Sequence, residues 1–317
     1  MDLSQLNLPK IDTLNVSSPG GNILQHALDL GGFGISRFAL DYQLSIIAKT
    51  NGVSILENSR VEDVQFGEDR FTIRSKTNFY FARVVAGTFG KRSNLDIKWQ
   101  RSFIKKRPGK LNNYIGVKYH VKSDHPANTI ALHNFKEGYC GISKIEDNKY
   151  CLCYLTTAQN LKDNKNLIPE MEKNVLHKNP YLKRIFTTSD FLFDSPVVIS
   201  QISFDRKKPV ENHILMIGDA SGMITPLCGN GMSMALHASK LAYGVITTYL
   251  ENKISRSDME HLYEKQWKHQ FLRRLWIGRL IQNLFGKETI TNLFLRLLKP
   301  FPTIINKLIK ATHGDSF

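Results

Sequence analysis

Apolar and polar residues alternate along the chain in a way that separates strand-like from helix-like stretches. Residues 11–34 hold short extended runs broken by Pro19-Gly20-Gly21, which predicts a β-hairpin. Residues 37–50 then carry an apolar stripe at helical spacing, and Asn51-Gly52 ends the predicted helix. The apolar residues at 53–56 favour a short strand.

Most of the middle of the chain follows the two-residue period of β-strands. The predicted strands are 61–66, 70–75 and 79–85, which form a meander, then 114–121, 129–135, 138–145, 149–155, 197–204 and 213–217. Helical patterns occupy residues 167–189 and most of the chain after residue 231. A parallel sheet completed by distant segments, with an antiparallel sheet inserted between them, fits this order, so we expect an α/β fold with interwoven domains.

The stretch LMIGDASGMITPLCGNGM, residues 215–232, carries the most specific signal in the chain. An apolar run delivers Asp219 to its C-terminal end, and Gly229 and Gly231 open a long helical pattern. Glycines let a ligand approach the first turn of a helix, where unpaired N–H groups and the helix dipole favour anions. The pattern therefore indicates an anionic cofactor bound as α/β folds bind one.

The spacing of Gly218-Asp219, Pro226 and Gly229-x-Gly231 resembles the second flavin-binding motif of the FAD-dependent oxidoreductases built like p-hydroxybenzoate hydroxylase. Within that superfamily it is most similar to the geranylgeranyl reductase branch. The resemblance implies FAD as the cofactor and three parts of the chain. These are an incomplete Rossmann-like FAD-binding domain (35–108 and 195–250), an antiparallel substrate-binding domain (1–34 and 109–194) and a basic helical region (251–317).

The resemblance also implies roles for the residues of this motif. Asp219 would accept hydrogen bonds from the ribityl hydroxyls, although an N-cap or turn-forming role is the alternative. Gly231 and Met232 would offer backbone N–H groups to the pyrimidine edge of the flavin, and Gly229 would let it approach. Pro226 would line the face of the ring.

Two residues outside this motif match the same superfamily. Arg37 matches an arginine that opens a helix facing the flavin phosphates, and an anionic partner would explain a guanidinium at a helix start. The alternative is a surface ion pair with Asp41. Val64 matches the strand whose backbone contacts the adenine.

The stretch ARVVAGTFGKRSNL, residues 82–95, resembles the middle motif of the superfamily. Gly87, Gly90, Arg92 and Ser93 match it, but Phe89 stands where an aspartate linked to flavin and pyridine-nucleotide binding is usual. Direct docking of NAD(P)H at this motif is therefore in doubt. We leave the electron donor open between NAD(P)H docked in another way and a different reductant.

The substrate side is read from EGYCGISKIEDNKYCLCYL, which is similar to a substrate segment of the reductase branch. Tyr139 fits the pattern, and Gly141 and Ser143 replace its large aromatic residues. Tyr139 and Gly141 are thus the predicted substrate-binding residues, for a small-molecule or carrier-bound hydrophobic substrate. The three tryptophans form no Trp-x-Trp pair, so halogenation is not expected.

The superfamily begins with a strand, a GxGxxG turn and a helix, and residues 1–22 show no such pattern. Gly31-Gly32-Phe33-Gly34 has the wrong spacing and no buried strand before it. We expect an oxidoreductase that transfers a hydride at flavin N5 to or from a lipid-like, polyketide or isoprenoid-type substrate. The alternatives are a flavin monooxygenase acting on an aromatic ring, and a truncated fragment that cannot hold FAD alone.

Composition narrows the setting of the protein. The four cysteines form no metal-binding spacing, and Cys151 and Cys153 share one face of a strand, which favours a packing role; no metal site is expected. No signal peptide and no apolar run long enough for a membrane span is visible, which predicts a cytoplasmic protein.

The formal charge of +15 requires an interpretation, and no nucleic-acid-binding signature accompanies it. Much of the positive charge lies in the tail, where Phe271 and Leu275 recur near helical spacing and Arg273, Arg274 and Arg279 fill other positions. Such a segment either lies on an anionic membrane, here at its inner face, or covers the core with a solvated side.

Overall fold

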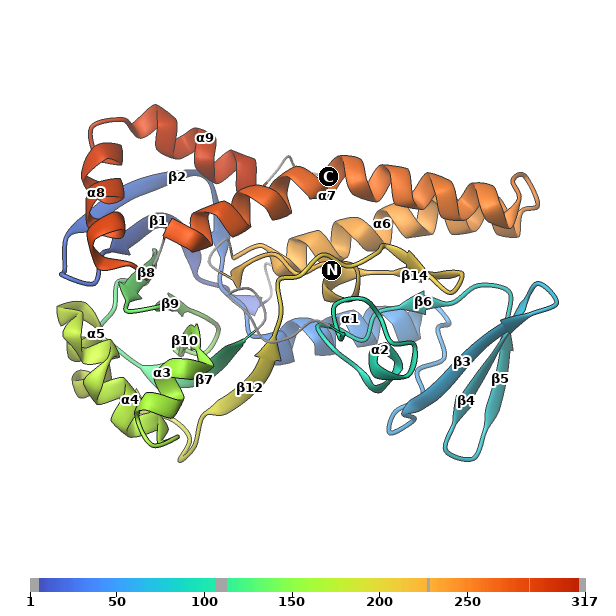
Figure 1. Ribbon diagram of the computed structural model, residues 1–317, viewed down its shortest axis with the longest axis horizontal. Coiled ribbons are helices and arrows are strands. Elements are labelled where there is room, and N and C mark those ends of the chain that lie inside the picture. The colour runs from blue at the N-terminus through green and yellow to red at the C-terminus, as the bar shows by residue number, and fades with distance from the viewer. Residues whose placement is uncertain (1–5, 106–112, 227–228, 285, 314–317) are drawn as a thin grey trace. The chain divides into compact units, whose positions relative to one another are not determined.

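The computed structural model describes residues 6–105, 113–226, 229–284 and 286–313 (Figure 1). The chain forms two compact units, and each is assembled from three separate stretches. The first unit comprises Met1–Ile55, Asn113–Ile202 and Ile281–Leu308, and the second comprises Leu56–Asn112, Ser203–Leu280 and Ile309–Phe317. The α/β class and the interwoven course of the chain agree with the sequence analysis.

A long hairpin opens the first unit. Strands β1 (Lys10–Ser17) and β2 (Ile23–Phe33) pair antiparallel, as the break at Pro19-Gly20-Gly21 predicts. Gly31 and Gly32 belong to β2, so the glycine-rich stretch there is strand and not a dinucleotide-binding turn.

Helix α1 (Arg37–Thr50) has the predicted bounds. The Ser36 side chain caps it by accepting a hydrogen bond from the N–H of Ala39 at 3.1 Å. The strand predicted at 53–56 is wrong: these residues form no ladder and all are exposed. A four-residue run with only three apolar positions is too weak a signal when no neighbouring strand pairs with it.

An eight-stranded sheet forms the body of the first unit. Its order is β11-β7-β10-β9-β8-β1-β2, and β12 also pairs with β7. The remaining strands are β7 (Tyr114–Lys122), β8 (Thr129–Phe135), β9 (Gly138–Lys144), β10 (Tyr150–Thr157), β11 (Asp190–Phe191) and β12 (Val197–Ile202). Strands β7 to β10 confirm the predicted run closely. Strand β1 runs parallel to β8, and the other neighbours are antiparallel.

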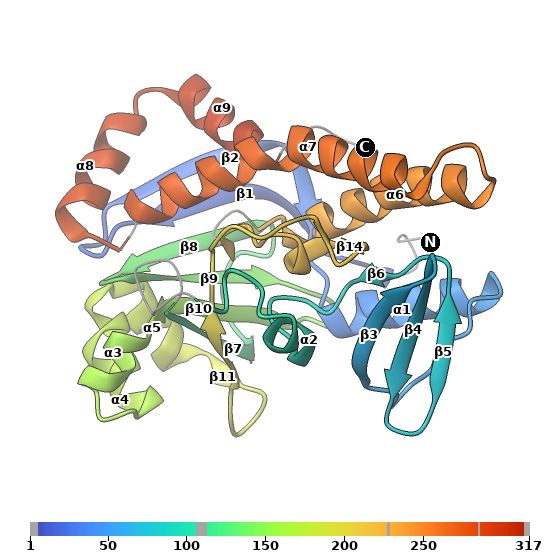
Figure 2. The same cartoon turned by 45° about the vertical axis from the view of Figure 1, so that its right-hand side comes forward.

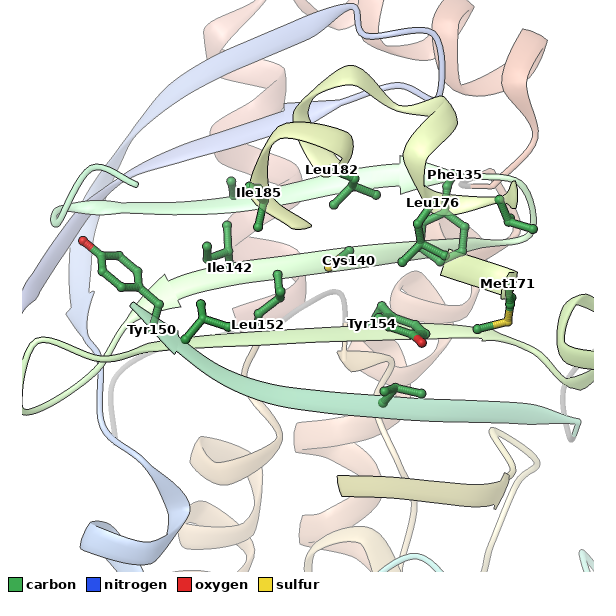
Figure 3. Packing of buried hydrophobic residues seen from close by; sticks show 14 of the residues in the cluster. Phe135, Cys140, Ile142, Tyr150, Leu152, Tyr154, Met171, Leu176, Leu182 and Ile185 are labelled. Atoms are coloured by element: carbon green, nitrogen blue, oxygen red, sulfur yellow. The ribbon is translucent and has the colours of Figure 1, made fainter. Parts of the chain in front are cut away.

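One face of this sheet is covered by short helices (Figure 3). They are α3 (Ala158–Asp163), α4 (Ile168–Asn174), the 3-10 turn η2 (Leu176–Lys178) and α5 (Pro180–Thr188). Cys140, Ile142 and Leu152 of the sheet are buried against Met171 and Leu182 of the helices. Burial of such side chains stabilises a sheet–helix pair by roughly 1.5–3 kcal/mol each.

The second unit holds two small sheets. Strands β3 (Val61–Gly67), β4 (Arg70–Ser75) and β5 (Phe79–Ala82) form the predicted antiparallel meander, which Figure 2 shows as a three-stranded ribbon. The other sheet has the order β13-β14-β6, with strands β13 (Val210–Glu211), β14 (Ile214–Met216) and β6 (Ala86–Gly87). Strands β14 and β6 pair in parallel although they are far apart in the sequence. This pair is the part of the predicted parallel sheet that the described residues contain.

Two long helices dominate the rest of the second unit. They are α6 (Gly231–Leu250) and α7 (Arg256–Leu284, the last residues of which lie in the first unit). Met234 and Val245 of α6 share a core with Trp267 and Phe271 of α7 and with Leu215 of β14. The short helix α2 (Asn94–Lys98) and the 3-10 turn η3 (Gly218–Ala220) complete the unit.

The C-terminal region is helical, as predicted, and ends in α8 (Glu288–Leu298) and α9 (Pro302–His313). Among the described residues, no helix is both long enough and apolar enough to cross a membrane.

The boundaries of the two compact units lie at residues other than the predicted domain boundaries. Helix α1 groups with the large sheet, whereas the sequence analysis placed it with the FAD-binding part. The C-terminal region is shared between the units and does not form a third one. The assignment of one part to cofactor and another to substrate stays a prediction.

Candidate functional site

The turn after β14 begins the candidate site. Strand β14 is fully buried, and Ile217 leads from it into Gly218, whose φ of +62° is the left-handed conformation that favours glycine. A Cβ at Gly218 would lie 3.2 Å from the Cβ of Ala235 on α6, so the turn and the helix approach each other closely here. Asp219 follows in the 3-10 turn η3 and is half-buried.

Hydrogen bonds and close contacts hold the loop that follows. Ser221 donates to the carbonyl of Gly218 at 2.8 Å and accepts from the indole N–H of Trp267 at 3.0 Å. A Cβ at Gly222 would come within 3.3 Å of Trp267 and 3.2 Å of Leu275. The loop is therefore anchored on α7, whereas Pro226, four residues further on, is exposed.

The N-terminus of α6 is open. Gly229 has a φ of +67°, and α6 begins at Gly231 without a side-chain cap on its first N–H groups. Among the described residues, apart from the chain neighbours and the backbone of α6 itself, no heavy atom lies within 4 Å of the place where a Cβ at Gly229 or Gly231 would be. The first N–H groups of a helix lack intrahelical partners and form its positive end. Open space in front of them therefore suits an anionic or hydrogen-bond-accepting ligand.

Asn230 lies between the two glycines and is buried. Its side-chain N–H₂ donates to the carbonyl of Thr312 on α9, and its side-chain oxygen has no hydrogen-bond partner among the residues that the structure describes. A buried amide oxygen without a partner costs about 1–3 kcal/mol. A ligand with a hydrogen-bond donor at this position would remove that cost.

Lys207 is a buried cation that contacts this turn. Its Nζ donates to the carbonyl of Asp219 at 2.7 Å and to the carbonyl of Lys91 at 2.7 Å, and it lies 4.5 Å from the centre of the Phe103 ring. Burial lowers the pKa of Lys207 to about 8. The sequence analysis did not identify this residue, because a single lysine in a loop gives no motif.

Arg101 holds the next carbonyl of the same turn. Its Nη1 donates to the carbonyl of Ala220 at 3.0 Å and to Oδ1 of Asp96 at 2.8 Å, and its Nε donates to Oε2 of Glu211 at 3.2 Å. The side chains of Arg101 and Asp96 are each only 1% exposed. Two buried cations, Lys207 and Arg101, thus hold the carbonyls of Asp219 and Ala220 and orient the turn that carries the Asp219 carboxylate.

The middle motif adjoins the same turn through the parallel strand pair. Gly87 pairs with Met216, and a Cβ at Gly87 would lie 2.7 Å from the Met216 sulfur, so any larger residue would have to displace the Met216 side chain. Ser93 caps α2 in a capping box with Asp96, which gives Ser93 a structural role. Phe89 packs against the local apolar core, and its ring centre lies 6.2 Å from that of Trp99.

Arg37 and Val64 have local partners. Arg37 forms a two-point ion pair with Asp41 one helical turn on, at 2.9 and 3.2 Å, and both side chains are more than half exposed. This is the alternative that the sequence left open. Val64 is a buried residue of β3 whose N–H donates to Oδ1 of Asp63 at 3.0 Å. The cofactor roles of Arg37 and Val64 stay predictions.

Tyr139 and Gly141 are neighbours on β9. They alternate with Cys140 and Ile142, which face the helices, so they point to the other face of the large sheet. Tyr139 is buried there, and Gly141 pairs with Cys153 of β10, which is exposed. The cysteine of the core is Cys140, and the packing role expected for the pair Cys151 and Cys153 is wrong for Cys153.

The structure thus places Asp219, Pro226, Gly229, Gly231 and Met232 on one loop and helix start of the second unit, which also contains Val64. Arg37, Tyr139 and Gly141 belong to the first unit. The open glycines and the unpartnered oxygen of Asn230 fit a flavin at the α6 N-terminus. Among the described residues, no cluster of side chains suits a metal ion.

No model of a known protein family matches the sequence. The chain is 24% identical over 253 residues to conditioned medium factor receptor 1 of Dictyostelium discoideum, a match that covers 75% of this chain and 48% of that protein. It is 29% identical over 69 residues to digeranylgeranylglycerophospholipid reductase of Methanococcus vannielii, which covers 22% of this chain and 18% of the reductase. The chain therefore spans about half the length of the Dictyostelium protein, and less of the reductase.

Solved structures give a fuller match. The flavin-dependent brominase Bmp2 superposes with a TM-score of 0.78 at 17% identity, covering 99% of this chain and 79% of the brominase. A geranylgeranyl bacteriochlorophyll reductase-like protein of Thermoplasma acidophilum has a TM-score of 0.72 at 15% identity, with 100% and 78% covered. HpxO of Klebsiella pneumoniae, solved with FAD and uric acid, has a TM-score of 0.71 at 14% identity, with 96% and 81% covered. The chain has the fold of the FAD-dependent oxidoreductases, as the motif at 215–232 predicts.

Proposed function

We propose that this chain binds FAD through the turn at Asp219 and the N-terminus of α6, and that it functions as a flavin-dependent oxidoreductase. The observation that carries the proposal is the pair of open glycines, Gly229 and Gly231, in front of an uncapped helix start. The fold shared with flavoproteins supports it.

Each residue of the site would contribute through its own chemistry. Asp219 would accept hydrogen bonds from hydroxyl groups of the cofactor, and Gly231 and Met232 would donate backbone N–H groups to carbonyl oxygens of its ring. The positive end of the α6 dipole would stabilise negative charge that develops there. When bound, the flavin supplies the redox chemistry by accepting or donating a hydride.

The substrate that we propose is lipid-like and hydrophobic. The reductase of Methanococcus vannielii is named for a digeranylgeranylglycerophospholipid, and a solved neighbour is named for its likeness to a geranylgeranyl bacteriochlorophyll reductase. Phe89 places an apolar ring where a carboxylate would favour docking of NAD(P)H. We therefore propose that NAD(P)H does not dock at this motif, and that the flavin is reduced either by NAD(P)H bound in another way or by a different reductant.

The test is a titration of the 317-residue chain with FAD, followed by visible absorption and flavin fluorescence. We expect saturable binding with one FAD per chain. FMN carries the ring and ribityl chain without the adenosine, so it should compete for this site, whereas ADP should not. Competition by ADP alone would assign binding to some other part of the chain.

Asp219→Asn tests the carboxylate directly. Loss of a charge-assisted hydrogen bond of about 1.5–3 kcal/mol weakens FAD binding by about tenfold or more. Asp194→Asn, at an exposed position of the first unit, is the matched control and should bind as the unchanged chain does. Unaltered binding by Asp219→Asn would remove this residue from the site.

A further inference from the structure

Helices α8 and α9, together with the residue just before α9, carry apolar side chains that are not buried in the core of the first unit. These residues recur every three or four positions, and all of them are exposed: Ile290 40%, Leu293 57%, Leu297 60%, Phe301 51% and Ile304 44%. Ile290, Leu293 and Leu297 lie along one side of α8, whereas Phe301 and Ile304 follow the break between the two helices, just before and within the first turn of α9. We name them the outer stripe.

The opposite side of the same helices accounts for their attachment. Thr291, Leu295 and Ile305 are buried there. Asn22 of the β1–β2 turn donates to the side chain of Asn292 at 3.0 Å, and His26 of β2 hydrogen-bonds Asn306. Figures 1 and 2 both show α8 beside the β1–β2 turn and α9 alongside β2. The outer stripe therefore points away from the sheet that holds these helices.

Cations flank the outer stripe. Lys287, Arg296, Lys299 and Lys307 are exposed, and Glu288 is the only acidic residue between positions 286 and 313. Within the described part of the chain, none of these four cations forms an ion pair. An exposed apolar side with cations at its edges is the pattern of helices that lie in the interface of an anionic bilayer.

The first unit contains another exposed apolar segment with the opposite charge. Phe193, Val197 and Val198 are 64%, 66% and 45% exposed. Their charged neighbours are Asp190 and Asp194, and no cation occurs between positions 190 and 200. Exposed apolar area alone thus does not distinguish the two segments, but charge does.

We propose that α8 and α9 dock this protein onto the surface of a bilayer that contains anionic phospholipids. The outer stripe enters the boundary between head groups and acyl chains, and Arg296 and Lys299 contact the lipid phosphates. This inference stands independently of the proposed function, because it rests on residues outside the candidate cofactor site.

The test is co-sedimentation of the 317-residue chain with vesicles. We expect binding to an equal mixture of phosphatidylcholine and phosphatidylglycerol, weaker binding in high salt, and little binding to phosphatidylcholine alone. The triple variant Leu293→Ser, Leu297→Ser, Phe301→Ser should lower the partition coefficient by about tenfold or more. Circular dichroism and thermal melting check that each variant folds.

Two matched controls sharpen the experiment. The triple variant Phe193→Ser, Val197→Ser, Val198→Ser removes similar exposed apolar area and should bind as the unchanged chain does. The pair Arg296→Glu, Lys299→Glu should weaken binding by about tenfold or more, and the pair Lys162→Glu, Lys165→Glu on the other side of the unit should weaken it less.

Three outcomes would overturn the proposal. One is equal binding to vesicles with and without phosphatidylglycerol. Another is equal loss of binding in the outer-stripe variant and in its control. The third combines two observations: the unchanged chain does not bind the vesicles, and it sediments as a dimer whereas the outer-stripe variant sediments as a monomer. The stripe would then be an interface between copies of this chain.

Discussion

The ammonium group of Lys207 lies 2.7 Å from the carbonyl oxygen of Asp219 and holds the turn from the side of its backbone. The same group donates to the carbonyl of Lys91 in the middle motif. One buried amine thus joins the Asp219 turn to the middle motif, which lies 116 positions before Lys207 in the sequence. The carboxylate of Asp219 is thereby positioned by a residue that need not touch the cofactor.

Replacing Lys207 by methionine removes both hydrogen bonds while keeping most of the apolar stem. Two carbonyls lose their donor in a buried site, so the free energy of unfolding should fall by about 1–3 kcal/mol. FAD affinity should fall as well, because the Asp219 turn is released. Chemical denaturation and FAD titration measure the two effects. Lys208→Met, next in sequence and exposed, should change neither of them.

Lys207 also makes a pH-dependent contribution to stability. Its pKa is about 8 in the folded chain and 10.5 in the unfolded one, so the unfolded state binds more protons between these values. The contribution is therefore fully present above pH 10.5 and is lost as the pH falls through 8. Between pH 7.5 and 10 the unchanged chain should gain about 2 kcal/mol relative to Lys207→Met. Parallel pH profiles in urea denaturation would contradict this assignment.

Arg101 neutralises two carboxylates in a buried site. Arg101→Met leaves Asp96 and Glu211 without their cation, and breaking a buried pair in this way costs about 3–5 kcal/mol. Thermal unfolding should show a large drop in Tm. The triple change Arg101→Met, Asp96→Asn, Glu211→Gln should recover much of the loss, since the two carboxylates that Arg101 compensates are then neutral as well. If the single variant keeps the Tm of the unchanged chain, the pair is not a structural element of the turn.

A substitution at Gly231 should affect FAD binding without a large effect on the free energy of unfolding. In the described parts of the chain, no heavy atom other than those of its neighbours and of the α6 backbone lies within 4 Å of its Cβ position, so Gly231→Val should change the free energy of unfolding by less than about 1 kcal/mol. The valine side chain would occupy the space in front of the first N–H groups of α6 and block FAD. Gly244→Val, at an equally open position later in α6, is the control and should leave FAD binding intact. Retained FAD binding in Gly231→Val would place the cofactor elsewhere.

The buried side chain of His133 should make the stability of the first unit fall at acidic pH. Its Nδ1 shares a hydrogen bond of 2.8 Å with the Ser17 hydroxyl, and burial lowers its pKa to about 3 from 6.5. The stability contributed by the neutral ring is present above pH 6.5 and is lost as the pH falls towards 3. Between pH 7 and 4.5 the unchanged chain should lose about 2 kcal/mol more than His133→Asn. Urea denaturation at the two pH values measures the difference.

Local patterns made most elements predictable. Helix α1 and the strands β7 to β10 have clear periods and turn residues at their ends, and the motif at Asp219 has fixed spacing. The run at 53–56 failed because strand formation depends on a pairing partner that a four-residue pattern does not reveal. Lys207 and Arg101 could not be predicted, because their partners are backbone carbonyls brought near only by the fold.

The hydrogen bond between Asn230 and the carbonyl of Thr312 joins residues 82 positions apart. Since a polypeptide is synthesised from its N-terminus, Asn230 emerges from the ribosome long before α9 does. The start of α6 therefore acquires this constraint only after nearly all of the described chain has been made. In a nascent chain that stops before Thr312, the side-chain N–H₂ of Asn230 would lack this acceptor. We therefore expect FAD to bind the candidate cofactor loop only late in synthesis.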